Sequence, residues 1–334
     1  MAGADQIRKT EGAFNSVRAG IGFVVLAMFC ISINDVLIKQ LSGSYPLHQM
    51  VGVRSGIGIL FSLFILQFEG GFRVLRTNRI GLHLLRCFSV IAANMLFFAA
   101  LAAIPLADAT ALFFVAPLFI TLLSIPVLGE RVGVRRLAAV GTGFLGVLIM
   151  LRPGGVSGDA SYHWLILILP VLGAFAYASM QVLTRALGPS SKASAMAVYV
   201  QGGFIITSFG FWLIAGDGRF AEGLENKSAI FLLRAWSWPT AQDWPLFVVL
   251  GLMSAVIGYA LTQAYRSADA TTIAPFEYVA LPMSIMWGWM VFGHWPDAWV
   301  MTGIVLIAGS GVYVFIREKQ RARAVASQRS LRRY

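Results

Sequence analysis

Long apolar runs alternate with short polar links along the chain, a pattern that predicts transmembrane helices. A helix needs roughly 20 apolar residues to cross the hydrocarbon core of a bilayer. Segments of this kind fall at about 20–41, 47–67, 80–102, 108–128, 134–151, 163–187, 192–214, 243–266, 270–292 and 297–316. The pattern therefore predicts an all-α integral membrane protein with ten transmembrane helices.

The composition excludes an ordinary soluble domain. The chain is 58% hydrophobic and only 12% charged, whereas soluble domains carry about 25% charged residues. The net charge of +11 is concentrated in a basic tail, 317–334, and in the short links between apolar runs. Basic residues in these places favour a bilayer partner and set topology, so we expect no nucleic-acid partner.

The distribution of the 26 Lys and Arg residues predicts the orientation of the chain. With the N-terminus in the cytoplasm, most of them fall in cytoplasmic links and in the tail. Those on the opposite side are Lys39, Arg152, Arg219, Lys227 and Arg234. Because positive residues favour the cytoplasmic side, we expect both termini to be cytoplasmic, with one long outer loop at 215–242.

The second part of the chain repeats features of the first. Asp108-Ala109-Thr110 recurs as Asp269-Ala270-Thr271, and the spacing of Phe29 to Leu41 recurs from Phe175 to Leu187. The repeat predicts two five-helix halves, 1–155 and 156–334. An odd number of crossings in each half inverts the second half relative to the first. Inverted repeats are typical of transporters whose substrate site lies between the halves near the midplane.

Several motifs resemble the drug/metabolite transporter superfamily of EamA type. They are Leu106-Ala107-Asp108-Ala109-Thr110, then Pro117, and Gly129-Glu130 at the end of the same segment. The resemblance implies two EamA-like repeats, a cavity lined by segments 1, 3, 4, 6, 8 and 9, and a bacterial inner-membrane location. The second half departs from the pattern, because Gly293-His294 stands where the first half has Gly129-Glu130.

The expected function is secondary-active transport of a small organic metabolite by alternating access. The substrate would be amino-acid-like, S-adenosylmethionine-like or another zwitterion or cation, with protons as one candidate coupling ion. An intramembrane enzyme acting on lipid head groups, or a channel for small solutes, is the alternative. An enzyme would need a convergent cluster of His, Asp or Glu at one membrane face, and the sequence shows none. We therefore expect a protein that is not an enzyme.

Polar residues within apolar runs identify the candidate site, because charge inside a membrane is costly and marks function. Glu277 lies between Pro275 and Pro282, which loosen their helix. Asp35 and Lys39 share a helix face at i and i+4 and can form a structural ion pair, with Arg54 as a further partner of Asp35. The alternative places Asp35 at the outer mouth of the cavity, as a gate or a cation contact. The expected substrate-binding residues are Glu277, Asp35, Asn34, Asn94, Phe98, Tyr177, Gln181, Tyr259, Gln263, Tyr278 and Trp287. We expect Arg86 to extend toward the cytoplasmic surface.

Two further patterns do not indicate cofactor chemistry. The run 141–146 matches G-x-G-x-x-G, but it lies inside a membrane segment instead of following a strand. Small residues in such a segment serve helix packing. His48, His83, His163 and His294 lack metal-ligand spacing. We therefore expect neither a metal nor a cofactor.

Overall fold

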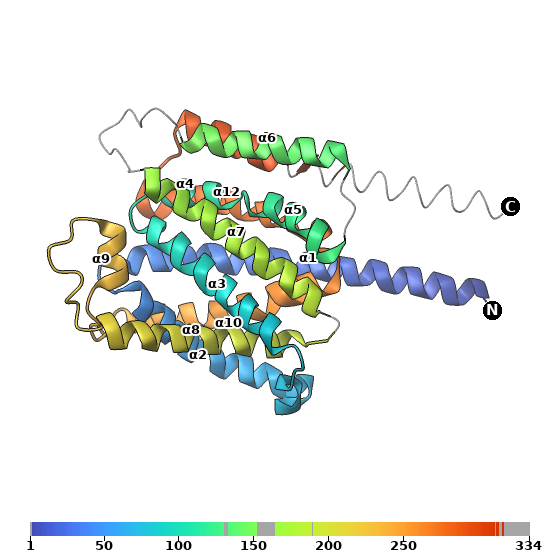
Figure 1. Ribbon diagram of the computed structural model, residues 1–334, viewed down its shortest axis with the longest axis horizontal. Coiled ribbons are helices and arrows are strands. Elements are labelled where there is room, and N and C mark those ends of the chain that lie inside the picture. The colour runs from blue at the N-terminus through green and yellow to red at the C-terminus, as the bar shows by residue number, and fades with distance from the viewer. Residues whose placement is uncertain are drawn as a thin grey trace.

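The protein is a bundle of helices. The computed structural model describes residues 2–129, 133–151, 164–188, 190–310, 312–313 and 316. Within these ranges the regular elements are helices, without a strand (Figure 1). The all-α prediction is therefore confirmed for the described part of the chain. The predicted basic tail 317–334 and the junction between residues 155 and 156 lie outside it.

The apolar helices coincide with the ten predicted segments to within a few residues. Seven are long and apolar enough to cross a bilayer: Val17–Leu41, Leu47–Glu69, Ile80–Leu101, Leu106–Leu128, Leu165–Leu187, Ala193–Ala215 and Trp244–Ser267. Three shorter apolar helices occupy the remaining segments: Leu137–Met150, Phe276–Phe292 and Ala298–Ser310. The structure thus supports the segment positions, while ten crossings in two inverted repeats stays a prediction.

Figure 1 labels the helices in chain order. Their bounds are α1 Ala2–Leu41, α2 Leu47–Glu69, η1 Gly71–Leu75, α3 Ile80–Leu101, α4 Leu106–Phe113, α5 Ala116–Leu128, α6 Val134–Leu151, α7 Trp164–Leu187, α8 Ala193–Ala215, α9 Lys227–Leu233, α10 Trp244–Ser267, α11 Ala270–Ile273, η2 Ala274–Val279 and α12 Ala280–Phe292. The short helix α9 lies within the predicted outer loop.

Two of the predicted segments are broken helices. The fourth segment divides into α4 and α5 around Phe114. The ninth contains a 3₁₀ stretch, η2, between α11 and α12, with a proline at its start. Proline lacks a backbone donor and its ring clashes with the preceding turn, which weakens the regular helix at this position. Both segments end on a left-handed glycine, Gly129 at φ 70° and Gly293 at φ 68°, a conformation that glycine adopts without steric cost.

The helices pair across the two halves of the sequence. The most extensive pairings are α1 with α10, α3 with α7, and α2 with α8, while α5 contacts α7 and α12 contacts α1. Gly146 on α6 faces the backbone of Gly303, and a Cβ atom added to Gly146 would lie 2.9 Å from that carbonyl oxygen. This close approach shows that Gly146 serves helix packing, as does Gly143 against Ser310, whereas Gly141 has no neighbour within 4 Å of an added Cβ atom.

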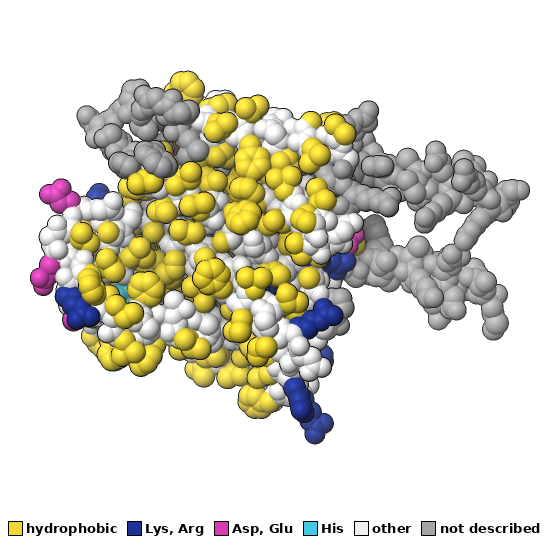
Figure 2. Space-filling model, viewed as in Figure 1, with side chains coloured by type: hydrophobic (Ala, Val, Ile, Leu, Met, Phe, Trp, Pro, Cys, Tyr) yellow, Lys and Arg dark blue, Asp and Glu magenta, His cyan; other side chains and the backbone are white. Residues whose placement is uncertain are grey.

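The surface carries its charge at two ends. Figure 2 shows hydrophobic side chains over the middle of this face, with Lys, Arg, Asp and Glu gathered at either end. The N-terminal end of α1 lies at one end of the bundle, and α9 lies at the other (Figure 1). An apolar belt between two charged ends is the arrangement that a bilayer-spanning bundle requires.

Candidate functional site

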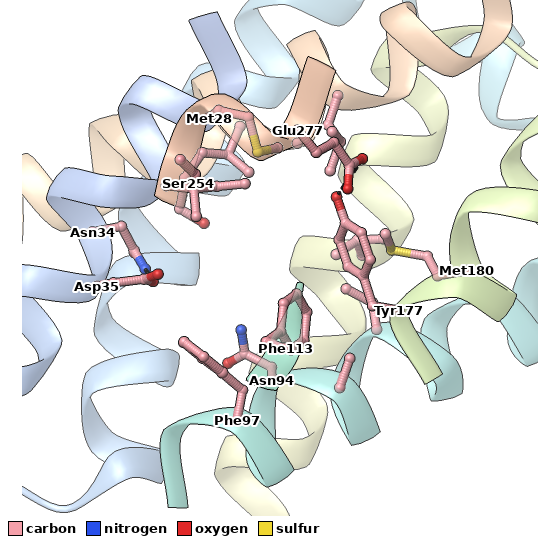
Figure 3. Close-up of a pocket in the computed structure, with 18 of the residues that line it drawn as sticks. Met28, Asn34, Asp35, Asn94, Phe97, Phe113, Tyr177, Met180, Ser254 and Glu277 are labelled. Carbon is pink, nitrogen blue, oxygen red and sulfur yellow. Dashed lines mark hydrogen bonds between the residues drawn. The ribbon is translucent and has the colours of Figure 1, made fainter. Parts of the chain in front are cut away.

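A central cavity lies within the helix bundle. It has a volume of about 160 Å³ and is lined by residues of α1, α2, α3, α4, α7, α8, α10, η2 and α12. The lining includes α2 and α8, which are the second and seventh segments. The implied lining by segments 1, 3, 4, 6, 8 and 9 was therefore incomplete. Figure 3 shows Asn34 and Asp35 on one side of the cavity, with Glu277 and Tyr177 on the opposite side.

Seven of the eleven predicted substrate-binding residues line this cavity. They are Asn34, Asp35, Asn94, Phe98, Tyr177, Gln181 and Glu277. These side chains come from four different segments, so the fold brings together residues that are up to 243 positions apart, as Asn34 and Glu277 are. Their role in binding a substrate stays a prediction.

Asn34 organises the charged cluster on its side of the cavity. Its amide nitrogen donates a 3.2 Å hydrogen bond to Oδ1 of Asp35, and its carbonyl oxygen accepts a 3.0 Å bond from Nη1 of Arg54. Nη2 of Arg54 donates a 2.8 Å bond to the amide oxygen of Asn94. Arg54 is thereby held by two neutral amides, and Asn34 connects the guanidinium group to the Asp35 carboxyl group.

The predicted Asp35–Lys39 pair is wrong. Nζ of Lys39 instead donates hydrogen bonds of 2.8 Å and 2.7 Å to the backbone carbonyls of Leu101 and Ile104. The last carbonyls of a helix lack intrahelical partners, and a cation near this terminus is favoured by the helix dipole. Lys39 therefore stabilises the end of α3, and it leaves Asp35 to the cavity.

Glu277 lies deep in the bundle at 2% exposure. Its Oε1 atom accepts a 3.0 Å hydrogen bond from Tyr177 on α7 and a 2.6 Å bond from Tyr265 on α10. The residue stands in η2, the irregular stretch that the two prolines predicted. The carboxyl group is thus positioned by two helices while still lining the cavity.

Arg86 does not extend to the cytoplasmic surface as expected. It is 3% exposed and lines the cavity. Its guanidinium group donates to Thr184 Oγ1 at 2.6 Å, to the Met196 carbonyl at 3.1 Å and to Thr262 Oγ1 at 3.0 Å. Three inward acceptors satisfy this group, so the side chain remains inside the bundle.

The other four predicted residues lie outside the cavity lining. Tyr259 donates a 2.9 Å hydrogen bond to Glu69, while Gln263 accepts one of 2.9 Å from Arg266. Trp287 reaches the cavity only through Ser32, to which its ring nitrogen donates at 3.2 Å. The Tyr278 ring packs against Phe114.

Helix periodicity explains the error on α10. Its cavity face consists of Ser254, Ile257, Gly258, Leu261 and Thr262. A helix turns by about 100° per residue, so Tyr259 and Gln263 share a face that is rotated away from the cavity. Sequence reasoning also missed Tyr265, the second donor to Glu277, because it carried no local signal other than a tyrosine in an apolar run.

Comparison with known proteins gives consistent results. The profile of the EamA-like transporter family matches residues 18–152. A riboflavin transporter of Rhizobium johnstonii is 30% identical over 96% of this chain and 99% of its own length. A pseudopaline exporter of Pseudomonas aeruginosa is 28% identical over 87% of this chain and 94% of its own length. An S-adenosylmethionine uptake transporter of Rickettsia prowazekii is 24% identical over 90% of this chain and 94% of its own length.

A solved crystal structure shares the fold. It superposes with a TM-score of 0.64 at 18% sequence identity, covering 92% of this chain and 98% of the solved chain.

Proposed function

Because the chain belongs to the EamA-like transporter family of the drug/metabolite transporter superfamily, we propose that it is a secondary-active carrier working by alternating access. It is a multi-pass membrane protein that transports small metabolites and is not an enzyme. The proposed location is a bacterial inner membrane, with both termini in the cytoplasm. Alternating access would arise from rocking of the two halves around the central cavity.

The contacts between helices support two inverted repeats, because the repeat maps each extensive helix pair onto another such pair or onto itself. The repeat relates α1 to α7 and α3 to α10. It therefore relates the pair α1–α10 to the pair α7–α3, and both pairs are extensive. The pair α2–α8 corresponds to itself, and the contact of α5 with α7 corresponds to that of α12 with α1. The breaks and the terminal glycines of the fourth and ninth segments also correspond.

The observation that carries the proposal is the cavity at the junction of these pairs. It places two carboxyl groups, Asp35 and Glu277, and two guanidinium groups, Arg54 and Arg86, around an interior with several aromatic rings. Ionisable groups inside a membrane protein are expensive and mark substrate or ion pathways. Within the proposal, Glu277 and Asp35 are the principal charged contacts of the substrate or of a coupling proton.

A flavin is the first substrate class to test. The relative from Rhizobium johnstonii is named a riboflavin transporter, and it aligns over nearly the whole chain. Phe97, Phe98, Phe113, Phe114 and Phe204 line the cavity. Aromatic side chains favour offset or edge contacts with flat rings, so these walls suit an isoalloxazine ring.

A zwitterion or organic cation is the second candidate class. The carboxyl groups of Asp35 and Glu277 favour it, because a buried carboxylate attracts a positive group in a low dielectric. The relative named an S-adenosylmethionine uptake transporter is similar over most of the chain. Amino-acid-like substrates belong to the same class.

Uptake into proteoliposomes tests both classes. Purified protein would be reconstituted with radiolabelled riboflavin or S-adenosylmethionine outside, with protein-free liposomes as the control. Saturable uptake that unlabelled substrate accelerates by counterflow supports a carrier, whereas flux that rises linearly with concentration supports a channel. Collapse of an imposed pH gradient with an ionophore then separates proton coupling from facilitated exchange. If the protein transports neither these two substrates nor any member of a broader metabolite panel, the proposal fails.

A further inference from the structure

Three buried polar groups of the cavity lining lack a hydrogen-bond partner. They are Nε of Arg54, Oγ1 of Thr110 and Nε2 of Gln181. The three residues are 4%, 4% and 1% exposed, so lipid or bulk water does not satisfy them. Buried polar groups in native proteins are almost always paired. Three exceptions around one cavity point to a ligand that completes their hydrogen bonds.

A continuous row of aromatic rings runs between two of these groups. The Arg54 guanidinium carbon lies 5.6 Å from the centre of the Phe98 ring. Ring centres then follow at 5.2 Å from Phe98 to Phe97, at 4.9 Å to Phe113 and at 5.3 Å to Tyr177. Gln181 stands one helical turn beyond Tyr177 on α7. Figure 3 shows Phe97, Phe113 and Tyr177 along one side of the cavity.

The unpaired atoms define the chemistry that the ligand must offer. The free atoms of Arg54 and Gln181 are nitrogens, and these groups donate without accepting. The Thr110 hydroxyl can donate as well, and it lies one turn before Phe113 and Phe114 on α4. A ligand that satisfies all three must present hydrogen-bond acceptors. A cation without acceptors would leave the donors unpaired and would meet the positive charge of Arg54.

We propose that the aromatic row, together with Arg54, Thr110 and Gln181, binds a flat heteroaromatic ring whose edge carries carbonyl oxygens or ring nitrogens. This inference rests on the proposed carrier function and names the substrate class of the same cavity. Arg54 is then a substrate-binding residue, and Asn34 and Asn94 position it through their hydrogen bonds to Nη1 and Nη2.

The test uses two substitutions that remove an unpaired group while keeping its shape. Thr110→Val deletes a buried hydroxyl without a hydrogen-bond partner, and Gln181→Leu deletes an amide whose nitrogen lacks one, although this side chain also interacts with the Tyr177 hydroxyl. Removal of such a group leaves folding unchanged or stabilises it, because its desolvation cost disappears. Thr142→Val is the matched control, since Thr142 is exposed on α6 and its hydroxyl bonds to the Ala138 carbonyl outside the cavity.

Each protein would be purified in detergent, and its thermal midpoint measured without ligand. Affinity for riboflavin and for lumichrome, the same type of ring without the ribityl chain, would be measured by quenching of their fluorescence. We expect Thr110→Val and Gln181→Leu to weaken binding about three- to tenfold with an equal or higher midpoint. Thr142→Val should bind both probes as the wild type does.

Unchanged affinity in both cavity variants would overturn the inference. So would weaker binding together with a lower thermal midpoint without ligand, because partial unfolding would then explain the loss of affinity. Failure of the wild type to bind either probe would also overturn it. If the same preparation then takes up S-adenosylmethionine, the proposed carrier function is still supported and only the ring-binding site is refuted.

Discussion

The hydroxyl of Tyr265 and the hydroxyl of Tyr177 both donate to one oxygen of Glu277, at 2.6 Å and 3.0 Å. Oε1 therefore connects η2 to α7 and α10, while Oε2 receives no hydrogen bond from a described residue. One oxygen holds the carboxyl group in place. Within the proposed function, we expect the other oxygen to contact a substrate cation or to take up a proton.

Replacing Glu277 by glutamine separates its charge from its structural bonds. The amide oxygen of Gln can accept both tyrosine hydrogen bonds, so the thermal midpoint should change little. The lost charge should lower the initial rate of substrate uptake about tenfold or more, because one buried charge-assisted hydrogen bond contributes roughly 1.5–3 kcal/mol. Uptake into proteoliposomes and thermal unfolding in detergent would be measured on the same preparations.

Glu69→Gln is the matched control for this substitution. Glu69 also accepts two side-chain hydrogen bonds, from Tyr259 and Ser194, but it lies outside the cavity lining. Its uptake rate should stay close to that of the wild type. Equal uptake by Glu277→Gln and the wild type would show that the charge of Glu277 does not contribute to transport.

Lys39→Met tests the reassignment of Lys39 to the end of α3. The substitution leaves the carbonyls of Leu101 and Ile104 without their donor, which should destabilise the protein by about 1–3 kcal/mol. If Lys39 does not pair with Asp35, the effects of Lys39→Met and Asp35→Asn should add to within about 0.5 kcal/mol in a double-mutant cycle. Chemical denaturation of the four proteins in one detergent would measure these energies. A coupling energy above about 1 kcal/mol between the two substitutions would show instead that Lys39 and Asp35 form a direct ion pair.

Hydropathy and proline placement predicted the parts of the structure that depend on local sequence. The segment positions follow from the length of the apolar runs, and the irregular helix around Glu277 follows from Pro275 and Pro282. Side-chain partners depend instead on how neighbouring helices are rotated. Tyr259 and Gln263 are four residues apart and share one face of α10, but the sequence could not show which face of α10 the cavity would meet.

The Lys39 error has a related cause. A pair at i and i+4 is favourable in an isolated helix by only about 0.2–0.5 kcal/mol. The backbone carbonyls of Leu101, the last residue of α3, and of Ile104, in the turn after it, lie more than 60 positions away in sequence and bind the same ammonium group instead. Arg86 likewise finds three inward acceptors that no local pattern indicates.

Tyr45→Phe should destabilise the contact between the loop after α1 and the start of α10 at neutral pH, and have less effect in acid. Tyr45 and Thr240 each donate a 2.7 Å hydrogen bond to Oδ2 of Asp243, and these bonds lower the pKa of Asp243 below its ordinary value of 3.8. A carboxyl group with a depressed pKa in the folded state stabilises the fold above its unfolded pKa. This contribution is lost as the pH falls through the lower, folded value.

The thermal midpoints of wild type and Tyr45→Phe would be compared from pH 7 down to about pH 3. We expect a lower midpoint for the variant at pH 7 and convergence of the two proteins at the acid end. Tyr313→Phe, at an exposed tyrosine, should match the wild type throughout. A difference that is constant across the range would assign the effect to the other hydrogen bond of the Tyr45 hydroxyl, which accepts from the backbone N–H of Thr240 at 3.1 Å.

Cysteine labelling decides whether the short helix α6 completes a crossing. Between Asn78 and Glu222 lie four of the long apolar helices and the shorter helix Leu137–Met150. Five crossings place the two positions on opposite sides of the membrane, and four place them on the same side. The basic residues Arg73, Arg76 and Arg79 beside Asn78 favour the cytoplasm for that link.

In a background with Cys30 and Cys87 replaced, an impermeant maleimide should therefore label Glu222→Cys in intact cells and Asn78→Cys only after permeabilisation. Labelling of both positions in intact cells, or of neither, would contradict five-helix halves and with them the inverted repeat.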